Sequence, residues 1–259
     1  MFHLSQHSDD MEQVAVDSAQ IVHRLVKPRQ MWYLWVKSAI DFVLAVVLLA
    51  VLGPIILAAA AIIKLTSKGP AFYVQKRLGK NGTVFTMVKL RTMVHDAESG
   101  TGPVWAKLDD PRVTRVGNFL RKTQIDEFPQ LINVLFGQMS LIGPRPERPE
   151  IANRLQLDIP DYSQRVQVRP GITGLAQLSL PADTDLESVR RKLVQDLYYV
   201  RNISLRLDLR IFAFTAIYFV GAIARFFWSM ISLPTWDVSR ERLHREFNDS
   251  TASTLKTHE

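Results

Sequence analysis

Two adjacent carboxylates in the middle of the chain, Asp126 and Glu127, follow the cations Arg121 and Lys122. A carboxylate can attack phosphorus to give an acyl phosphate, and it can hold a divalent cation beside a leaving group. Adjacent acids could divide these two tasks. The structural alternative is a helix cap, because Thr123 and Asp126 have the spacing of a capping box and a first helical turn favours acids by about 0.3–1 kcal/mol. Taken alone, the pair favours the cap.

Basic residues in turn-rich segments supply what a diphosphate ligand needs. A diphosphate carries about two negative charges, which arginine can bind in a bidentate manner while a carboxylate-held cation stabilises the leaving group. In Gly143-Pro144-Arg145-Pro146, two prolines restrict the backbone and present the arginine at little entropic cost. The candidate phosphate-binding residues are Lys89, Arg91, Arg112, Arg115, Arg121 and Arg145. Each of them, considered singly, is also explained as a solvated surface charge.

Composition narrows the class of protein. The 259 residues carry a formal net charge of +7, which indicates an anionic partner such as nucleic acid, phospholipid or a phosphorylated substrate. The absence of cysteine excludes disulfides and thiolate metal sites. We expect no secretory signal, because acidic residues fall within residues 1–20 and the first long apolar run starts too late.

That apolar run, Phe42 to Ile63, contains no charged residue and predicts a membrane anchor. As a straight helix it would be about 33 Å long, close to the roughly 30 Å of a bilayer core. Gly53-Pro54 near its middle predicts a kink, because proline donates no hydrogen bond and its ring disrupts the preceding turn. Each arm would then be about 17 Å long.

Both flanks of the anchor are basic. Lysine and arginine favour the cytoplasmic side and gain about 1 kcal/mol each near an anionic surface, so a hairpin that returns to the same face satisfies both flanks. A kinked spanning helix is the alternative, and these features alone do not decide between the two. The flanking cations are Arg24, Lys27, Arg29 and Lys37 before the run, and Lys64, Lys68, Lys76, Arg77 and Lys80 after it.

The rest of the chain predicts short elements. Residues 71–75 and 84–88 are expected to be strands joined by a turn, residues 121–136 mainly helix, and residues 187–200 a helix packed on the core. Arg169-Pro170-Gly171 begins a second rigid turn, with a plain connection between strands as its simplest role.

A second apolar stretch, Ile211 to Leu233, is rich in aromatic residues and interrupted by Arg225, so it either spans the membrane or lies in the interface. The expected organisation is a polar N-terminus at 1–20, an interfacial approach and anchor at 21–66, a catalytic domain at 67–208, an apolar helix at 209–236 and a polar tail at 237–259.

Several long motifs, in this order along the chain, resemble those of the bacterial sugar transferases, also called monotopic phosphoglycosyl transferases. The resemblance runs from about Lys37 to Ala222. Its motifs are Ser67-Lys68-Gly69-Pro70-Ala71-Phe72-Tyr73, Lys89-Leu90-Arg91-Thr92-Met93, Asp109-Asp110-Pro111-Arg112, Asp126-Glu127-Phe128-Pro129-Gln130-Leu131, Gly143-Pro144-Arg145-Pro146-Glu147 and Arg169-Pro170-Gly171-Ile172-Thr173-Gly174.

The resemblance implies an enzyme that moves a sugar-1-phosphate from a UDP-sugar to undecaprenyl phosphate and releases UMP, at the start of capsule, exopolysaccharide or O-antigen synthesis. It implies Asp126 as the nucleophile that forms a covalent phosphosugar intermediate, and Glu127 as the carboxylate associated with Mg²⁺. Its other functional polar positions match Lys89, Arg121, Arg145 and Asp208, with Asp196 as a weaker candidate.

The resemblance also implies a membrane-associated α/β fold: a re-entrant helix-break-helix anchor with its break at Gly53-Pro54, a small catalytic domain and interfacial helices on the cytoplasmic face of the bacterial inner membrane. Two departures stand out. The family often has Lys-Arg ahead of the anchor aspartate, whereas here Ser38 follows Lys37, leaving Lys37 to pair with Asp41. The break is commonly Ser-Pro, and Gly53 offers no hydroxyl to the carbonyl that proline frees.

Two other classes of protein compete with this interpretation. A polytopic transferase would use the same substrates but needs many spanning helices, and this chain has two candidates at most. A basic, membrane-tethered binding protein for nucleic acid or phosphoinositide-like lipid would use Asp126 and Glu127 merely as a cap. We expect membrane lipids and no nucleic acid as partners, and the minimal catalytic form with a short N-terminal extension. The sequence leaves the sugar and any homo-oligomer open.

Overall fold

The computed structural model describes residues 27–95, 97, 110–180 and 185–220. Their first element is α2 (Met31–Thr66), a helix of 36 residues. Among the described residues, it is the one helix long and apolar enough to cross a membrane. Most of its outer surface is exposed aliphatic and aromatic side chains, including Trp35, Val51 and Leu57. The predicted apolar anchor is therefore present as a helix compatible with membrane association.

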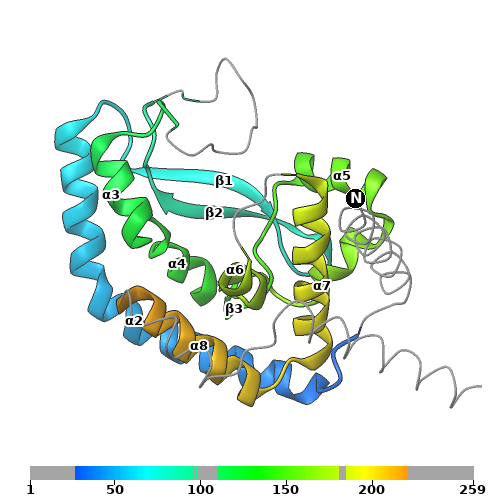
Figure 1. The fold of residues 1–259 in the computed structure, drawn as a ribbon. Helices are drawn as coiled ribbons and strands as arrows, with labels where there is room; N and C mark the ends of the chain where they lie inside the picture. The colour runs from blue at the N-terminus through cyan, green and yellow to red at the C-terminus, as the bar shows by residue number, and fades with distance from the viewer. Residues whose placement is uncertain (1–26, 96, 98–109, 181–184, 221–259) are drawn as a thin grey trace, which may run out of the picture.

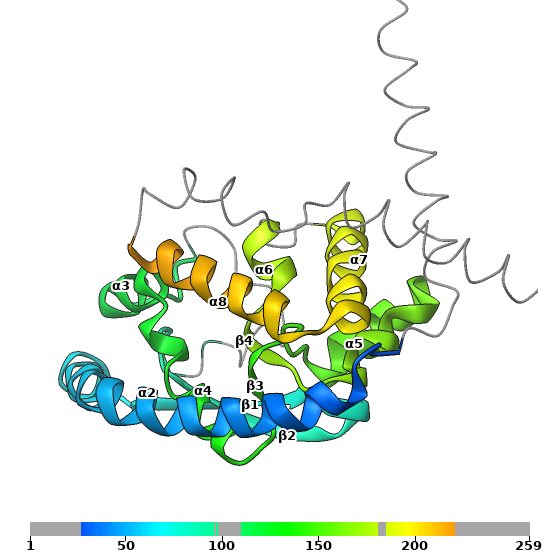
Figure 2. The same ribbon diagram turned by 90° about the horizontal axis from the view of Figure 1, so that it is seen from below.

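The α2 helix bends near its middle. Figures 1 and 2 show a first arm along one edge of the molecule and a second arm that turns off at its end toward α3 (Arg115–Thr123). Pro54 lies inside the helix, where it removes a backbone donor. A Cβ at Gly53 would meet no atom within 4 Å, so packing does not require a glycine there. The predicted kink is confirmed, and its cause is the proline.

Both arms of α2 pack against the rest of the protein. The first arm buries one face at four-residue spacing, through Tyr33, Lys37, Asp41 and Ala45. The second arm buries Ile56, Ala59, Ala60 and Ile63 in a separate apolar cluster that includes Leu90 and Leu120. The bent helix thus holds the remaining elements from two sides.

Two small sheets carry the strands. β1 (Phe72–Leu78) and β2 (Val84–Leu90) pair antiparallel, with Leu78 opposite Val84, so the strands predicted at 71–75 and 84–88 are confirmed and each is longer. The turn between them is the short helix η1 (Lys80–Gly82). β3 (Ser140–Ile142) and β4 (Gly171–Thr173) pair in parallel, so the turn beginning at Arg169 does lead into a strand. The fold is mixed α/β, as expected.

Residues 121–136 are mainly helical, as predicted, but the helical segments are interrupted. The α3 helix ends at Thr123, Gln124 has a left-handed backbone with φ of 55°, and a single 3-10 turn, η2 (Ile125–Glu127), follows. Helix α4 (Gln130–Leu135) then begins after Pro129. A proline has no N–H and is tolerated at the start of a helix but not in its interior, which explains the interruption.

The C-terminal half is helical: α5 (Pro149–Asp158), η3 (Pro160–Gln167), α6 (Leu175–Ser179), α7 (Leu186–Asn202) and α8 (Leu205–Val220). The α7 helix confirms the prediction at 187–200, and Leu193, Leu197 and Val200 on it are almost fully buried in the core. The α8 helix contains the start of the second apolar stretch. The rest of that stretch, the N-terminus at 1–20 and the tail at 237–259 lie outside the described residues.

Candidate active site

Asp126 and Glu127 lie in the single turn η2, between the left-handed Gln124 and Pro129. The helix-cap interpretation is wrong. Thr123 is the last residue of α3, and its hydroxyl donates to the Phe119 carbonyl at 2.9 Å. Neither η2 nor α4 has a side-chain cap. The two acids therefore lie in a tight turn, and neither side chain caps a helix.

Glu127 is clamped by two cations that come from distant parts of the chain. Its Oε1 lies 2.7 Å from Lys89 Nζ on β2 and 2.7 Å from Arg145 Nη2, and its Oε2 accepts from Arg145 Nη1 at 3.2 Å. Burial by itself would raise the pKa of Glu127, but Arg145 and Lys89 outweigh it and hold that pKa well below its usual range. The structure thus brings Lys89 and Arg145 together at Glu127 and keeps this carboxylate ionised.

Asp126 differs from its neighbour. It is buried, and among the described residues it makes no hydrogen bond and no ion pair. Burial, with a contribution from the Glu127 charge, raises the pKa of Asp126 to about 6, although Lys89, Arg145 and Arg121 act in the opposite direction. A carboxylate that is desolvated, without a partner and close to three cations is suited to attack an electrophile that arrives with negative charge.

Arg121 reaches the site from α3, where its Nε donates to Thr92 Oγ1 at 2.8 Å. The backbone of α3 is pressed against Thr92, because a Cβ on Gly117 would lie 1.9 Å from the Thr92 carbonyl oxygen. This close approach fixes the position of Arg121 near Asp126.

Three other predicted phosphate-binding residues lie elsewhere. Arg91 donates to Ser67 at the end of α2, with 2.7 Å to its Oγ, and Arg112 pairs with Asp110 at 2.6 Å. Arg115 begins α3. Of the six basic candidates, the structure therefore brings Lys89, Arg121 and Arg145 to the acids, and it gives Arg91 and Arg112 other bonds.

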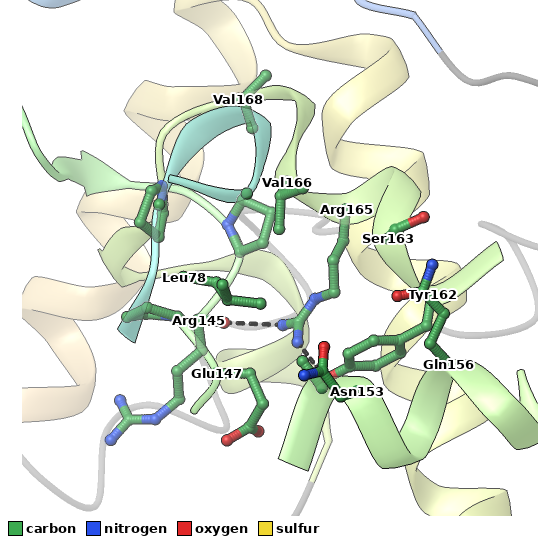
Figure 3. A pocket seen from close by; sticks show the side chains of 16 residues that line it. Leu78, Arg145, Glu147, Asn153, Gln156, Tyr162, Ser163, Arg165, Val166 and Val168 are labelled. Carbon is green, nitrogen blue, oxygen red and sulfur yellow. Dashed lines mark hydrogen bonds between the residues drawn. The ribbon is translucent and has the colours of Figure 1, made fainter. Parts of the chain in front are cut away.

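Asp196 connects to the site through an arginine that the sequence analysis did not single out. Arg165 Nη2 lies 2.6 Å from Asp196 Oδ2 and also donates to the backbone carbonyl of Arg145 at 2.9 Å. Arg165 lines a cavity of about 210 Å³. Figure 3 shows that the Arg145 guanidinium is directed away from Arg165. No sequence motif indicates Arg165, because its partners Arg145 and Asp196 lie 20 and 31 residues away along the chain.

Asp208 lies in a different place. It is buried and pairs with Lys37 at 2.8 Å, while Tyr33 and Tyr199 donate to its two oxygens at 2.8 and 2.7 Å. The expected pair of Lys37 with Asp41 is present at 3.7 Å, and Asp208 is the nearer partner. Direct phosphate binding by Asp196 or Asp208 stays a prediction, and both carboxylates are engaged by cations in this structure.

The turn that bears Arg145 is held by backbone contacts. A Cβ on Gly143 would lie 2.5 Å from the Arg169 carbonyl, and one on Gly171 would lie 2.1 Å from the Gly143 nitrogen. The Gly171 N–H donates to the Pro144 carbonyl at 2.9 Å. Glycine is needed at both positions so that the turns after β3 and before β4 can touch.

The donor set suits a magnesium ion shared with a substrate. A carboxylate has about four lone-pair sites, and Glu127 uses three of them on Lys89 and Arg145, which leaves one for a metal. Among the described residues there is no cluster of three His, Cys, Asp or Glu side chains able to hold a metal. Magnesium commonly has one or two protein carboxylates and takes further ligands from phosphates and water, so the residues fit that mode.

The described residues thus form an α/β unit with a bent apolar helix compatible with membrane association, and among them Asp126 is a buried carboxylate that lies near three cations without bonding to any of them. The chain belongs to the bacterial sugar transferase family, whose model matches residues 32–222.

Similar proteins carry consistent names. An Aeromonas hydrophila protein named UDP-N-acetylgalactosamine-undecaprenyl-phosphate N-acetylgalactosaminephosphotransferase is 43% identical over 69% of this chain and 42% of its own length. A Caulobacter vibrioides UDP-glucose:undecaprenyl-phosphate glucose-1-phosphate transferase is 46% identical over 68% of this chain and 66% of its own. A putative undecaprenyl-phosphate N-acetylgalactosaminyl 1-phosphate transferase of Bacillus subtilis is 50% identical over 52% and 74%. The chain therefore spans less than two thirds of the length of the first two.

We expect Asp126→Asn to stabilise the protein at pH 8. Because the folded-state pKa of Asp126 is raised from 3.8 to about 6, the ionised carboxylate opposes folding above pH 6, by roughly 2–3 kcal/mol, and this penalty is absent below pH 4. The melting temperatures of the variant and the parent, compared at pH 8 and below pH 4, measure this penalty.

Glu127→Gln is the matched control with the opposite sign. In the parent protein the pKa of Glu127 is lowered, so the ionised carboxylate stabilises the fold above pH 4.5, and this stabilisation is lost as the pH falls. The control should therefore lower the melting temperature at pH 8. A lower melting temperature for Asp126→Asn at pH 8 would show that the Asp126 carboxylate is structural.

Proposed function

We propose that this protein transfers a sugar-1-phosphate from a UDP-sugar to undecaprenyl phosphate, releases UMP, and so begins the assembly of a bacterial polysaccharide. The observation that carries the proposal is the contrast within the acid pair. Glu127 is ionised and clamped by Lys89 and Arg145, while Asp126 is buried, has a raised pKa and bonds to no other described residue. The names of the relatives support the class of donor and acceptor.

In the first step, an Asp126 oxygen attacks the phosphorus that bears the sugar. A bond forms between Asp126 and that phosphorus, and the bond from phosphorus to the bridging oxygen breaks. The bridging oxygen leaves with the electron pair as part of UMP. Lys89, Arg121 and Arg145 neutralise the charge that builds up on the phosphate oxygens, which lowers the barrier where water is excluded.

In the second step, a phosphate oxygen of undecaprenyl phosphate attacks the same phosphorus. The bond to Asp126 breaks, its electron pair returns to the carboxylate, and the lipid diphosphate sugar is the product. The carboxylate is regenerated in its starting ionisation state, so the two displacements need no net proton transfer by the protein. Magnesium, with Glu127 as its protein ligand, would screen the negative charge of the diphosphate.

We propose further that α2 re-enters the cytoplasmic face of the inner membrane. Both of its arms pack against the rest of the described protein: the first is bonded to β3 through Asp41, and the second packs on Leu90 of β2 and Leu120 of α3. A straight spanning helix would carry one of these contacts to the opposite side of the bilayer. The bend at Pro54 and the basic flanks support a return to the starting face.

A panel of UDP-sugars tested with undecaprenyl phosphate should reveal a donor that releases UMP. Asp126→Asn should abolish both UMP release and the phosphosugar adduct, and Arg145→Ala should slow turnover by about a hundredfold, because it removes a donor to the developing charge. Arg154→Ala, which removes an exposed arginine on α5, is the control and should retain activity. Turnover by Asp126→Asn would disprove the proposed nucleophile.

Adduct formation without lipid acceptor should rise about tenfold between pH 5 and pH 7. With a pKa of about 6, roughly a tenth of Asp126 is ionised at pH 5 and nine tenths at pH 7. Glu127 stays ionised throughout this range, so it adds no titration of its own. Single-turnover measurement of the adduct at saturating donor tests this, and a flat profile would contradict it.

Single cysteines can test re-entry because the chain has none of its own. Lys37 is buried, so the exposed Lys27 and Lys68 are better labelling positions on the two flanks. Lys27→Cys and Lys68→Cys should both resist an impermeant maleimide in cells with a permeable outer membrane, and both should react after the inner membrane is opened. Reaction of one position alone in intact cells would show that α2 spans the membrane.

A further inference from the structure

The first arm of α2 bears a polar face that the proposed chemistry does not use. We name Tyr33, Lys37, Ser38 and Asp41 the anchor seam. Tyr33, Lys37 and Asp41 are at most 7% exposed, in a helix whose other faces are apolar. Burying charges is costly, and well-packed apolar side chains in their place are often neutral or stabilising. A role in positioning α2 against the rest of the protein would explain why these buried polar residues are present.

The seam ties the anchor to both strands of the β3–β4 sheet. Ser140 Oγ on β3 donates to Asp41 Oδ2 at 2.7 Å, and the Leu141 N–H donates to Asp41 Oδ1 at 3.3 Å. Arg169, which precedes β4, donates to Ser38 Oγ at 2.9 Å. Ser38 therefore has a specific bond at the position where this chain departs from the family's usual Lys-Arg.

The same sheet leads directly to the reactive centre. β3 ends at Ile142 and continues into the turn that bears Arg145, and this turn is locked to Gly171 of β4 by a hydrogen bond at 2.9 Å. Arg145 in turn clamps Glu127, next to Asp126. Hydrogen bonds joined by short backbone segments thus connect α2 with Glu127, the neighbour of Asp126.

The two substrates place different demands on this connection. A UDP-sugar arrives from water and can reach Asp126 at any height above the membrane, whereas the phosphate of a polyprenyl lipid stays at the headgroup level. Trp32 and Trp35, exposed at the start of α2, are of the type that anchors a helix at this level. The angle between α2 and the elements that carry Asp126 then decides whether Asp126 and the lipid phosphate lie at the same height relative to the membrane.

We propose that the anchor seam sets the height of Asp126 over the membrane surface, and that it thereby governs the lipid acceptor step while leaving the donor step largely unaffected. Its residues are positioning residues, and none of them contacts the acid pair among the described contacts. The kinetic part of this inference rests on the proposed function. The geometric part does not.

Ser38→Ala and Ser140→Ala test the seam while the charged side chains Lys37 and Asp41 stay in place. Each removes one tie, of about 1 kcal/mol, and should raise the KM for undecaprenyl phosphate about fivefold in vesicles that contain it. The single-turnover rate of adduct formation from a UDP-sugar without acceptor should change less than twofold. A role in folding alone would slow both steps alike, and that result would overturn the proposal.

Thr66→Ala is a matched control on the same helix. The hydroxyls of Ser38 and Thr66 both donate to a carbonyl four residues earlier at 2.7 Å, but Ser38 also receives Arg169, while Thr66 is exposed at the far end of α2. The control should leave the KM for the lipid unchanged. An equal rise for Thr66→Ala would show that the effect comes from the helix in general, which contradicts the proposal.

A depth measurement separates the seam from the chemistry. A fluorophore on Phe119→Cys, at an exposed position of α3, reports height through quenching by brominated phospholipids. Ser38→Ala should change this quenching, and Thr66→Ala should not. If the parent protein releases no UMP from any UDP-sugar, the proposed function fails while this readout still decides the geometry. Unchanged quenching in Ser38→Ala would overturn the seam's effect on height.

Discussion

The clamp of Lys89 and Arg145 on Glu127 is the interaction on which the site depends. It joins three segments of the chain: the second strand of the hairpin, the 3-10 turn after α3 and the turn after β3. Because Glu127 takes up both cations at 2.7 Å, Asp126 is left without an ionic partner. With Arg121 included, three cations face two acids, and the remaining positive charge has the sign that a diphosphate ligand would require. This ion-pair cluster therefore ties three segments together at the site and accounts for the difference between Glu127 and Asp126.

The burial of Asp126 works against stability, and the proposed function uses this same desolvated carboxylate as the nucleophile. A desolvated carboxylate with a pKa of about 6 is held in an unfavourable environment that the rest of the fold maintains. The surroundings are correspondingly rigid. Backbone contact at Gly117 fixes α3, the contact between Gly143 and Gly171 fixes the Arg145 turn, and Arg165 with Asp196 supports that turn from behind. These contacts resist the relaxation that would otherwise give Asp126 a partner.

How far the sequence predicts this arrangement depends on whether a feature is local. The hairpin strands, the α7 helix and the kink at Pro54 follow from short patterns and are confirmed. Residues 121–136 are mainly helical as predicted, but the sequence pattern did not indicate that the left-handed Gln124 and Pro129 divide them into separate helical segments. Spacing alone made Asp126 look like a cap, and the ordered family motifs were needed to favour a reactive role. Arg165 and the bond between Arg169 and Ser38 could not be predicted, since they join residues 31 and 131 positions from their partners.

The two departures from the family's usual pattern turn out to differ in kind. At Gly53 the structure shows open space and a bend that Pro54 explains, so the loss of a serine there removes one local hydrogen bond and leaves the shape of the helix intact. At Ser38 the change replaces a long cation by a short hydroxyl at the point where Arg169 arrives. In this chain the cation is Arg169, which precedes β4, and it donates a hydrogen bond to Ser38 on α2. Since Lys37 beside it already pairs with Asp41 and Asp208, a second cation on α2 would meet Arg169 as a like charge. Ser38 avoids this repulsion and still accepts the hydrogen bond from Arg169 that connects α2 to the segment before β4.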